Sequence, residues 1–213
     1  MRRVVLVHGA ATGSRVWDAT AAALRGRIEG GRVEVLCPDR PQSGDLDTEI
    51  AFLAPLCAGA FVVGVSGGAT LGLELAARGV PIAGAVLHEP AAGSLAPGLL
   101  DHVAEGLLSG GIDGFGAALY GPAWDRSCTT ATPETVAAEF AMFGAFEPAP
   151  LGERARLVTL TVGGNSPPPR HRSVRVLCEH LGVAMRVLAG VGHAAHLEDG
   201  AALAALVPGV GSP

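Results

Sequence analysis

The chain contains no lysine: all fifteen basic residues among its 213 are arginine. Without a lysine amine, it cannot form a Schiff base with a carbonyl substrate or with pyridoxal phosphate. The phosphate-binding loop in which a lysine contacts a nucleotide is excluded for the same reason. Any catalysis by this chain therefore depends on serine, histidine, carboxylates, thiols or backbone amides, and we expect no cofactor.

Cysteine is scarce, and its spacing argues against two further kinds of site. No two cysteines form a Cys-x-x-Cys pair, the spacing typical of structural zinc sites and redox dithiols. We therefore expect reduced, mostly buried thiols in a cytoplasmic protein and no metal site. The four cysteines are Cys37, Cys57, Cys128 and Cys178.

Basic clusters and long apolar runs are also missing. The formal net charge is −5, and without a basic cluster this disfavours a nucleic-acid partner. The first apolar run, Val4–Val7, is too short for a signal-peptide core or a membrane span. Hydrophobic residues make up 49% of the chain, enough for a sizeable core, so residues 1–213 are expected to form a single domain. The oligomeric state is left open.

Short β-branched runs alternate with longer segments rich in alanine and leucine. This alternation predicts a parallel sheet with helices on both faces, its strands apolar on both sides and fully buried. The predicted strands are Val4–Val7, Val33–Leu36, Phe61–Val65, Ile82–Leu87, Leu157–Val162 and Ala184–Leu188. Helices are expected near residues 17–26, 46–58, 67–78, 170–181 and 198–207.

The alternation breaks once, between the strand ending at Leu87 and the strand starting at Leu157. This interval is too long for a simple crossover connection. It is expected to form a helical cap insertion, at about residues 91–154, over one end of the sheet. Weak helical patterns lie in it at about 97–109, 111–120 and 133–143.

The stretch Gly64-Val65-Ser66-Gly67-Gly68 matches the pattern G-x-S-x-G. The pattern alone is weak, because 31 residues of this chain are glycine. Its position carries the argument, since it follows a predicted buried strand and precedes a helical stretch, Ala69–Arg78. The flanking glycines let the serine adopt a strained backbone conformation that exposes its hydroxyl, and the helix N-terminus offers free amides. Ser66 is therefore the candidate nucleophile, the alternative being an ordinary tight turn.

Two other loops follow predicted strands at the same edge of the sheet. The first, in VVLVHGAA at residues 4–11, is a small-residue loop whose Ala10 amide can stabilise an oxyanion together with the Gly67 amide. The second, in GVGHAAH at residues 190–196, places His193, the candidate general base for Ser66, just past the last strand, and His196 is expected to start the next helix. A loop histidine or a metal-binding histidine pair is the alternative, but the pair lacks further ligands.

Taken together, these motifs resemble the α/β-hydrolase superfamily. VVLVHGA, CPDRP at 37–41, GVSGG, VLHEP at 86–90 and GVGHAAHLE at 190–198 follow the superfamily's order and spacing over nearly the whole chain. The resemblance implies an α/β-hydrolase fold with a mostly parallel sheet. Because the chain begins at what resembles the third strand of the full fold, we expect the opening hairpin to be absent and about six strands to remain.

The resemblance also implies a carboxylate that orients the histidine, and here the sequence departs from the usual pattern. Superfamily members usually carry it in a Gly-x-x-Asp stretch after the penultimate strand, where this chain has Asn165. Some members draw the acid from the end of the preceding strand, where this chain has Glu89. Glu89 is the leading candidate, and Asn165 or no third member are the alternatives.

The resemblance implies a serine-dependent acyl hydrolase that acts through an acyl-enzyme on an ester, thioester or lactone. The predicted cap is rich in aromatic residues that either pack the cap or contact a small-to-medium apolar carbonyl substrate. Trp124, Phe143 and Tyr120 are the candidate substrate contacts. The superfamily also includes enzymes without net hydrolysis, such as lyases, cyclases and catalysts of carbon–carbon chemistry. A non-catalytic ligand-binding receptor is the alternative from another class.

Overall fold

The computed structural model describes residues 2–26 and 33–209. Within them the chain forms a parallel six-stranded sheet in the order β2-β1-β3-β4-β5-β6. The α/β-hydrolase fold predicted from the sequence is therefore confirmed. The strands are β1 Arg2–Val7, β2 Val33–Leu36, β3 Phe61–Val65, β4 Gly84–His88, β5 Val158–Gly163 and β6 Ala184–Leu188.

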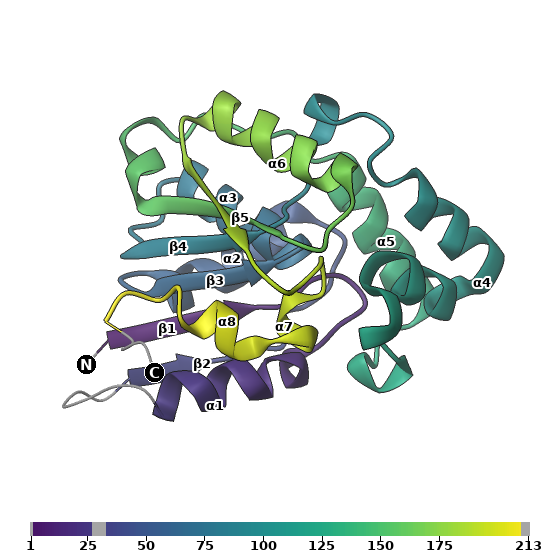
Figure 1. Cartoon of the computed structure of the whole chain (residues 1–213), viewed down its shortest axis with the longest axis horizontal. Helices are drawn as coiled ribbons and strands as arrows, with labels where there is room; N and C mark the ends of the chain where they lie inside the picture. The colour runs from purple at the N-terminus through teal and green to yellow at the C-terminus, as the bar shows by residue number, and fades with distance from the viewer. Residues whose placement is uncertain (1, 27–32, 210–213) are drawn as a thin grey trace.

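Helices cover both faces of this sheet (Figure 1). One face packs against α2, α3 and α6, and the other against α1, α7 and α8. The two faces separate because successive strand residues point to opposite sides, so that Val5 and Val7 join one core while Val4 and Leu6 join the other. These helices are α1 Asp18–Gly26, α2 Leu46–Cys57, α3 Gly67–Ala77, α6 Pro168–Leu181, α7 Ala195–Glu198 and α8 Gly200–Ala204.

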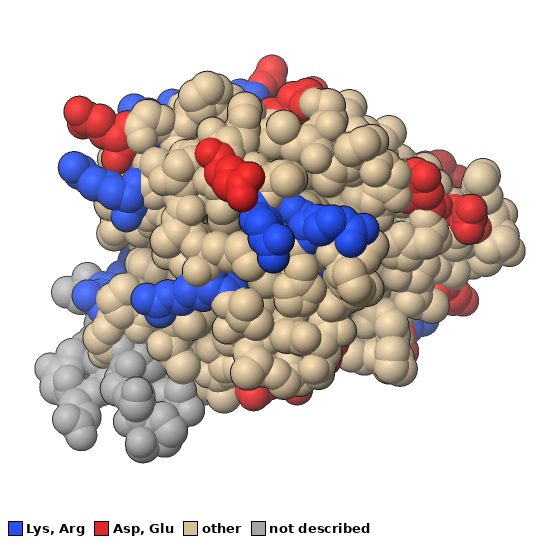
Figure 2. All heavy atoms as spheres, turned by 45° about the horizontal axis from the view of Figure 1, so that its top comes forward, with Lys and Arg blue, Asp and Glu red and all other residues tan. Residues whose placement is uncertain are grey.

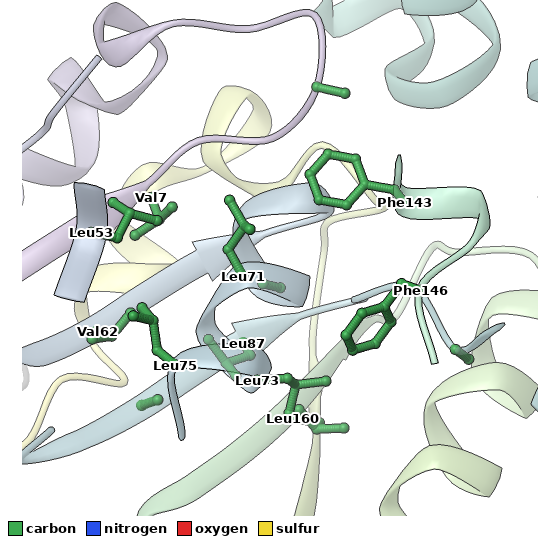
Figure 3. Close-up of a cluster of buried hydrophobic side chains, with 14 of the residues drawn as sticks. Val7, Leu53, Val62, Leu71, Leu73, Leu75, Leu87, Phe143, Phe146 and Leu160 are labelled. Carbon is green, nitrogen blue, oxygen red and sulfur yellow. The ribbon is translucent and has the colours of Figure 1, made fainter. Parts of the chain in front are cut away.

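The larger core lies between the sheet and α2 and α3 (Figure 3). Leucines of α3 interdigitate there with the apolar side chains of β1, β3, β4 and β5. Phe143 and Phe146 extend the same cluster toward the segment that joins β4 to β5. This segment is thus anchored to the domain core through buried aromatic rings.

Full burial was predicted for every strand, and it is wrong for two of them. All residues of β2 are partly exposed, and of β6 only Leu188 is buried. The reason is topological: β2 and β6 are the two edges of the sheet, so each has only one neighbouring strand. The central strands β1, β3, β4 and β5 are buried as expected.

Helices dominate the segment between β4 and β5. Its longer helices are α4, Asp101–Tyr120, and α5, Pro133–Gly144, and both lie beyond the carboxyl ends of the strands (Figure 1). The break expected between residues 109 and 111 is a kink inside α4, where Gly111 adopts φ 56°. Short 3-10 turns complete the segment: Gly93–Leu95, Gly121–Ala123, Arg126–Cys128 and Gly152–Leu157. Treating residues 1–213 as one domain with a cap at about 91–154 stays a prediction.

Membrane-spanning potential and cysteine burial follow from this fold. No helix among residues 2–26 and 33–209 is both long and apolar enough to cross a membrane. The four cysteines are free thiols; Cys57 and Cys178 are buried, whereas Cys37 and Cys128 are only partly so.

Candidate active site

Ser66 stands at a sharp corner between β3 and α3. Its backbone adopts φ 56° and ψ −123°, a region that non-glycine residues rarely occupy. A Cβ on Gly68 would lie 1.9 Å from the Val7 carbonyl oxygen, and one on Gly64 would lie 2.4 Å from the Gly68 oxygen. The strained serine and the steric need for both flanking glycines are thus present as the sequence predicted.

His193 contacts the carboxylate that the sequence favoured. Its Nδ1 lies 2.8 Å from Glu89 Oε2, and both side chains are buried. The other carboxylate oxygen, Oε1, accepts hydrogen bonds from the Gly163 amide and the Ser166 hydroxyl. Glu89 reaches this position from the end of β4 with φ 47°, another strained backbone conformation. The chain therefore holds the carboxylate at both oxygens and directs one of them at the imidazole.

Asn165, the alternative acid position, is exposed. Its backbone amide donates to the Val191 carbonyl at 2.9 Å, and among the described residues its side chain makes no hydrogen bond to His193. Ser166, the next residue, is the one that turns inward to Glu89. The geometry thus assigns the contact with the ring to Glu89.

Burial and local charges set the protonation states of this pair. Burial alone would raise the pKa of Glu89, but the hydrogen bond and positive charge of His193 outweigh it and hold this pKa well below its ordinary value. Burial lowers the pKa of His193 to about 4, aided by the positive charge of Arg170 and opposed by Glu89. At neutral pH, the pair is therefore a carboxylate next to a neutral imidazole.

The opposite ring nitrogen, His193 Nε2, is buried and has no hydrogen-bond partner among the described residues. The ring stacks on Tyr120 with centroids 5.6 Å apart and an interplanar angle of 20°. With Nδ1 directed at Glu89, Nε2 carries the free lone pair of the neutral ring. Contacts between catalytic groups are often long in structures without substrate and shorten in the complex, so the unpaired Nε2 is compatible with a role as base.

A second histidine holds the loop that carries His193. In His88, Nδ1 lies 2.9 Å from the Thr161 hydroxyl, and Nε2 lies 3.0 Å from the Gly192 carbonyl oxygen. Glu198 accepts from the Gly192 amide on the other side. His88 was not identified from the sequence as a site residue, although it directly precedes Glu89 in VLHEP.

His196 has no such contacts. It belongs to α7, as the sequence predicted, and packs near Trp17 and Tyr120. Both of its ring nitrogens are buried and have no partner among the described residues. Burial lowers its pKa to about 3. His196 is therefore a neutral packing residue rather than a second base.

The loop after β1 has its carbonyl groups fixed by side chains. Arg40 donates to the carbonyls of His8 and Gly9, Tyr120 donates to Ala10, and Trp124 donates to Ala11. Within the described part of the chain, no hydrogen bond uses the amide of Ala10 or the amide of Gly67, the first residue of α3. Ala10 and Gly67 line the same cavity as Ser66. Both proposed oxyanion donors are thus available there.

The cavity at Ser66 is small, about 30 Å³. A single water needs roughly 10–15 Å³ of such space, so the cavity has room for about two waters and not for a substrate. A larger hollow of about 490 Å³ lies next to it, and both spaces are lined by Ala91, Leu100, Phe140 and Phe143. The three large side chains of this group lie between the serine and the outer hollow.

The three predicted substrate contacts have different positions. Phe143 lines the cavity and packs directly over Gly67, where an added Cβ would lie 2.5 Å from its ring. Tyr120 and Trp124 are not among its lining residues; they are buried and donate hydrogen bonds to the Ala10 and Ala11 carbonyls. These bonds support the loop after β1, and a contact of either residue with substrate stays a prediction.

Arg170, in the first turn of α6, was missed by the sequence analysis. It is 5% exposed and lines the same cavity as Ser66 and Glu89, with its Nε 3.7 Å from Glu89 Oε2. Elsewhere in the described part of the chain, no group of three or more His, Cys, Asp or Glu side chains is placed to hold a metal ion.

The comparisons with known proteins agree with this architecture. A sequence profile described as the alpha/beta hydrolase family matches residues 4–206. A search of curated proteins finds no match.

Solved structures with a similar fold include MenH from S. aureus, with a TM-score of 0.71, 15% identity, and coverage of 98% of this chain and 92% of the other. A carboxylesterase structure from the thaumarchaeon Nitrososphaera gargenis has a TM-score of 0.68 at 19% identity, covering 92% and 85% of the two chains. The enol-lactonase from Burkholderia xenovorans LB400 has a TM-score of 0.64 at 17% identity, covering 97% and 89%. At these identities, the likeness establishes the fold.

Proposed function

Because the chain belongs to the alpha/beta hydrolase family, we propose that it is a serine-dependent acyl hydrolase. Ser66 is the nucleophile, His193 the general base and acid, and Glu89 the carboxylate that orients the imidazole. The amides of Ala10 and Gly67 bind the oxyanion.

One observation carries this proposal. A strained serine and a buried Glu89–His193 pair, contributed by three different loops, meet at one end of the sheet. Two of the three residues stand at positive φ, a conformation that costs on the order of 1–3 kcal/mol for each residue. Residues with such strain cluster at functional sites, where the surrounding structure holds them in place.

In the first half of the reaction, Ser66 Oγ forms a bond to the substrate carbonyl carbon and its proton passes to His193 Nε2. The electron pair of the carbonyl moves onto oxygen, where the two amides stabilise it. The intermediate then breaks the bond to the leaving group, which takes the proton from His193. An acyl ester of Ser66 remains.

In the second half, a water gives one proton to His193 and adds to this ester. Collapse of the second intermediate releases the carboxylic acid and returns a proton to Ser66. Glu89 stays ionised throughout and offsets the charge of the imidazolium. No external oxidant, metal or cofactor enters either half.

Esters, thioesters and lactones all fit this sequence of steps. The carboxylesterase and the enol-lactonase among the similar structures support cleavage of a carboxylic ester bond. The apolar wall of the cavity, with Leu100, Phe115 and Phe143, supports a substrate with an apolar portion. The contact between Glu89 and His193 supplies the carboxylate that this sequence of steps requires.

The deciding experiment is labelling with a fluorophosphonate followed by peptide mass spectrometry. We expect modification of Ser66 alone, and we expect Ser66→Ala to lose labelling and on the order of 10⁴-fold or more of the turnover of 4-nitrophenyl esters. Ser109→Ala, which removes an exposed hydroxyl of α4, is the matched control and should keep both. An unlabelled wild-type protein, as expected of a ligand-binding receptor, would refute the proposal.

A further inference from the structure

Arg170 has an unusual environment for a positive charge. It lies in the first turn of α6, and its side chain is only 6% exposed. Burial lowers the pKa of the Arg170 guanidinium. A buried arginine normally satisfies its five N–H groups with acceptors, because an unpaired buried charge is costly.

These acceptors are missing. Among the described residues, the Arg170 side chain donates no hydrogen bond, and its nearest anion is Glu89, 3.7 Å from Nε. That distance is beyond hydrogen-bond length, and the same oxygen, Oε2, already bonds His193. Glu89 thus offsets part of the charge of Arg170 and leaves its donors unused.

The unused donors belong to a residue that lines the cavity of Ser66. Most of that cavity's wall is apolar, with Leu100, Val103, Phe115, Leu119, Phe140 and Phe143. Arg170 is the one cationic side chain among the lining residues. Basic side chains also lie on the outer surface that Figure 2 shows, but there they are exposed, and salt screens exposed charges. Within the cavity, the positive charge is concentrated at Arg170.

We propose that Arg170 binds a carboxylate group of the substrate, so that the preferred substrates are esters, thioesters or lactones that carry a free carboxylate on the acyl portion. A guanidinium matches a carboxylate through two parallel N–H···O bonds, which are stronger and more specific in a buried site. The apolar wall then contacts the carbon chain between the carboxylate and the reacting carbonyl. This inference rests on the proposed function and narrows its substrate class.

A bound carboxylate also has an electrostatic effect on the reaction. The positive charge of Arg170 opposes protonation of His193, and thus opposes formation of the imidazolium. A substrate carboxylate on Arg170 offsets that charge, so the imidazolium forms more readily when the correct substrate is bound. A neutral ester lacks this assistance, and discrimination therefore appears in turnover as well as in binding.

The test compares pairs of substrates that differ only in the carboxylate. Mono(4-nitrophenyl) esters of succinate, glutarate and adipate are each paired with the corresponding 4-nitrophenyl methyl diester, and kcat/KM is measured for both. We expect at least one acid to be preferred over its diester by about tenfold or more. High salt should reduce this preference less than it reduces attraction between exposed charges, because the contact between Arg170 and the carboxylate forms in a buried site.

Three variants distinguish loss of the Arg170 contact with the substrate carboxylate from a general loss of activity. Arg170→Met should lower the acid-to-diester ratio of kcat/KM by at least about tenfold. Arg170→Lys should retain part of this ratio, because lysine keeps the positive charge but cannot form the two parallel hydrogen bonds of a guanidinium. Arg175→Met removes an exposed arginine of the same helix and should leave the ratio within twofold of the wild type. The ratio is informative even if a variant is less active toward both substrates.

A binding measurement gives an answer that does not depend on turnover. Calorimetric titration of Ser66→Ala with glutarate and with dimethyl glutarate should detect the diacid only, and the added substitution Arg170→Met should abolish that signal. Equal binding of the diacid with and without Arg170 overturns the inference. Turnover of neutral diesters through Ser66 with no preference for the acids also overturns it, and leaves the proposed function intact. Absence of labelling at Ser66 overturns the proposed function instead.

Discussion

At the scale of single residues, Glu89 is held by hydrogen bonds at both of its carboxylate oxygens. Three hydrogen bonds reach its two carboxylate oxygens, from His193, Gly163 and Ser166. Each bond comes from a different position on or after β5 and β6, so the carboxylate can rotate only if several of them break. This rigidity suits a group that fixes the tautomer of the imidazole.

We therefore expect Glu89→Gln to reduce turnover of a 4-nitrophenyl ester by about 10²- to 10⁴-fold. The amide has nearly the same shape, but it offers no negative charge to the imidazolium and favours the wrong tautomer. Single-turnover and steady-state rates, with circular dichroism to verify folding, provide the measurement.

Asn165→Ala is the control for this prediction. Asn165 is exposed and lies next to Ser166 in the chain, so its loss should change turnover by less than about threefold. If Asn165→Ala were the damaging substitution and Glu89→Gln the silent one, the assignment of the acid would be reversed.

Ser66, His193 and Glu89 could be predicted as site residues because each follows a strand in a recognisable motif, and the structure places them at the same end of the sheet. The sequence could not identify Arg170, which stands in PPPRHRS among other polar residues and looks like part of a solvated helix start. Its burial depends on how the first turn of α6 packs against Glu89, and this is a property of tertiary structure. The hydrogen bond from the Tyr120 hydroxyl to the Ala10 carbonyl is likewise a property of the fold, because the sequence shows only an aromatic residue.

At the scale of elements, α5 and the start of α4 control access to Ser66. Phe140 and Phe143 of α5, together with Leu100, separate the 30 Å³ cavity from the hollow of about 490 Å³. A substrate must displace at least one of these side chains to reach the serine. Because Phe143 lies over Gly67, its ring also occupies the space next to a proposed oxyanion donor.

Phe143→Ala should open this passage. We expect a lower KM for 4-nitrophenyl esters with long acyl chains relative to acetate, by about threefold or more, together with a loss of stability of about 3–5 kcal/mol. Phe146→Ala is the matched control: its ring is equally buried and lines neither space. It should lower stability similarly and leave the ratio of KM values unchanged. An unchanged ratio in Phe143→Ala would show that substrates enter elsewhere.

The helices and strands themselves were largely predictable, and the failures have physical causes. The central strands are marked by unbroken apolar runs, because both faces of a parallel sheet are covered. The sequence of an edge strand such as Ala184–Leu188 contains similar residues, so its exposure depends on strand order and not on composition. In α4, the sequence showed a helical pattern on each side of Gly111, but it did not show that the two helical segments join into one kinked helix.

At the scale of the whole molecule, buried histidines make stability depend on pH. The pKa values of His8, His88, His193 and His196 are all lowered, and in each of them burial is the largest cause. The unfolded chain therefore binds protons first as the pH falls below about 6.5, and stability decreases with it. Glu89 acts at lower pH: its pKa is also lowered, so its contribution is lost only below the ordinary pKa of a glutamate, 4.5.

His196 permits the sharpest test of this pH dependence. Both of its ring nitrogens are buried and have no partner among the described residues, so His196→Phe removes a titrating group and breaks no hydrogen bond there. As the pH falls from 6.5 to about 4, each such histidine lowers the free energy of unfolding by up to about 1.4 kcal/mol per pH unit. We expect urea unfolding at pH 7.5, 6 and 5 to show that the free energy of unfolding declines less steeply for His196→Phe than for the wild type. The difference in slope should correspond to nearly one proton fewer taken up on unfolding. His180→Ala, which removes an exposed histidine of α6, should decline in parallel with the wild type. A parallel decline of His196→Phe as well would mean that the ring is already protonated in the folded protein, and that its burial among Trp17 and Tyr120 does not exclude charge.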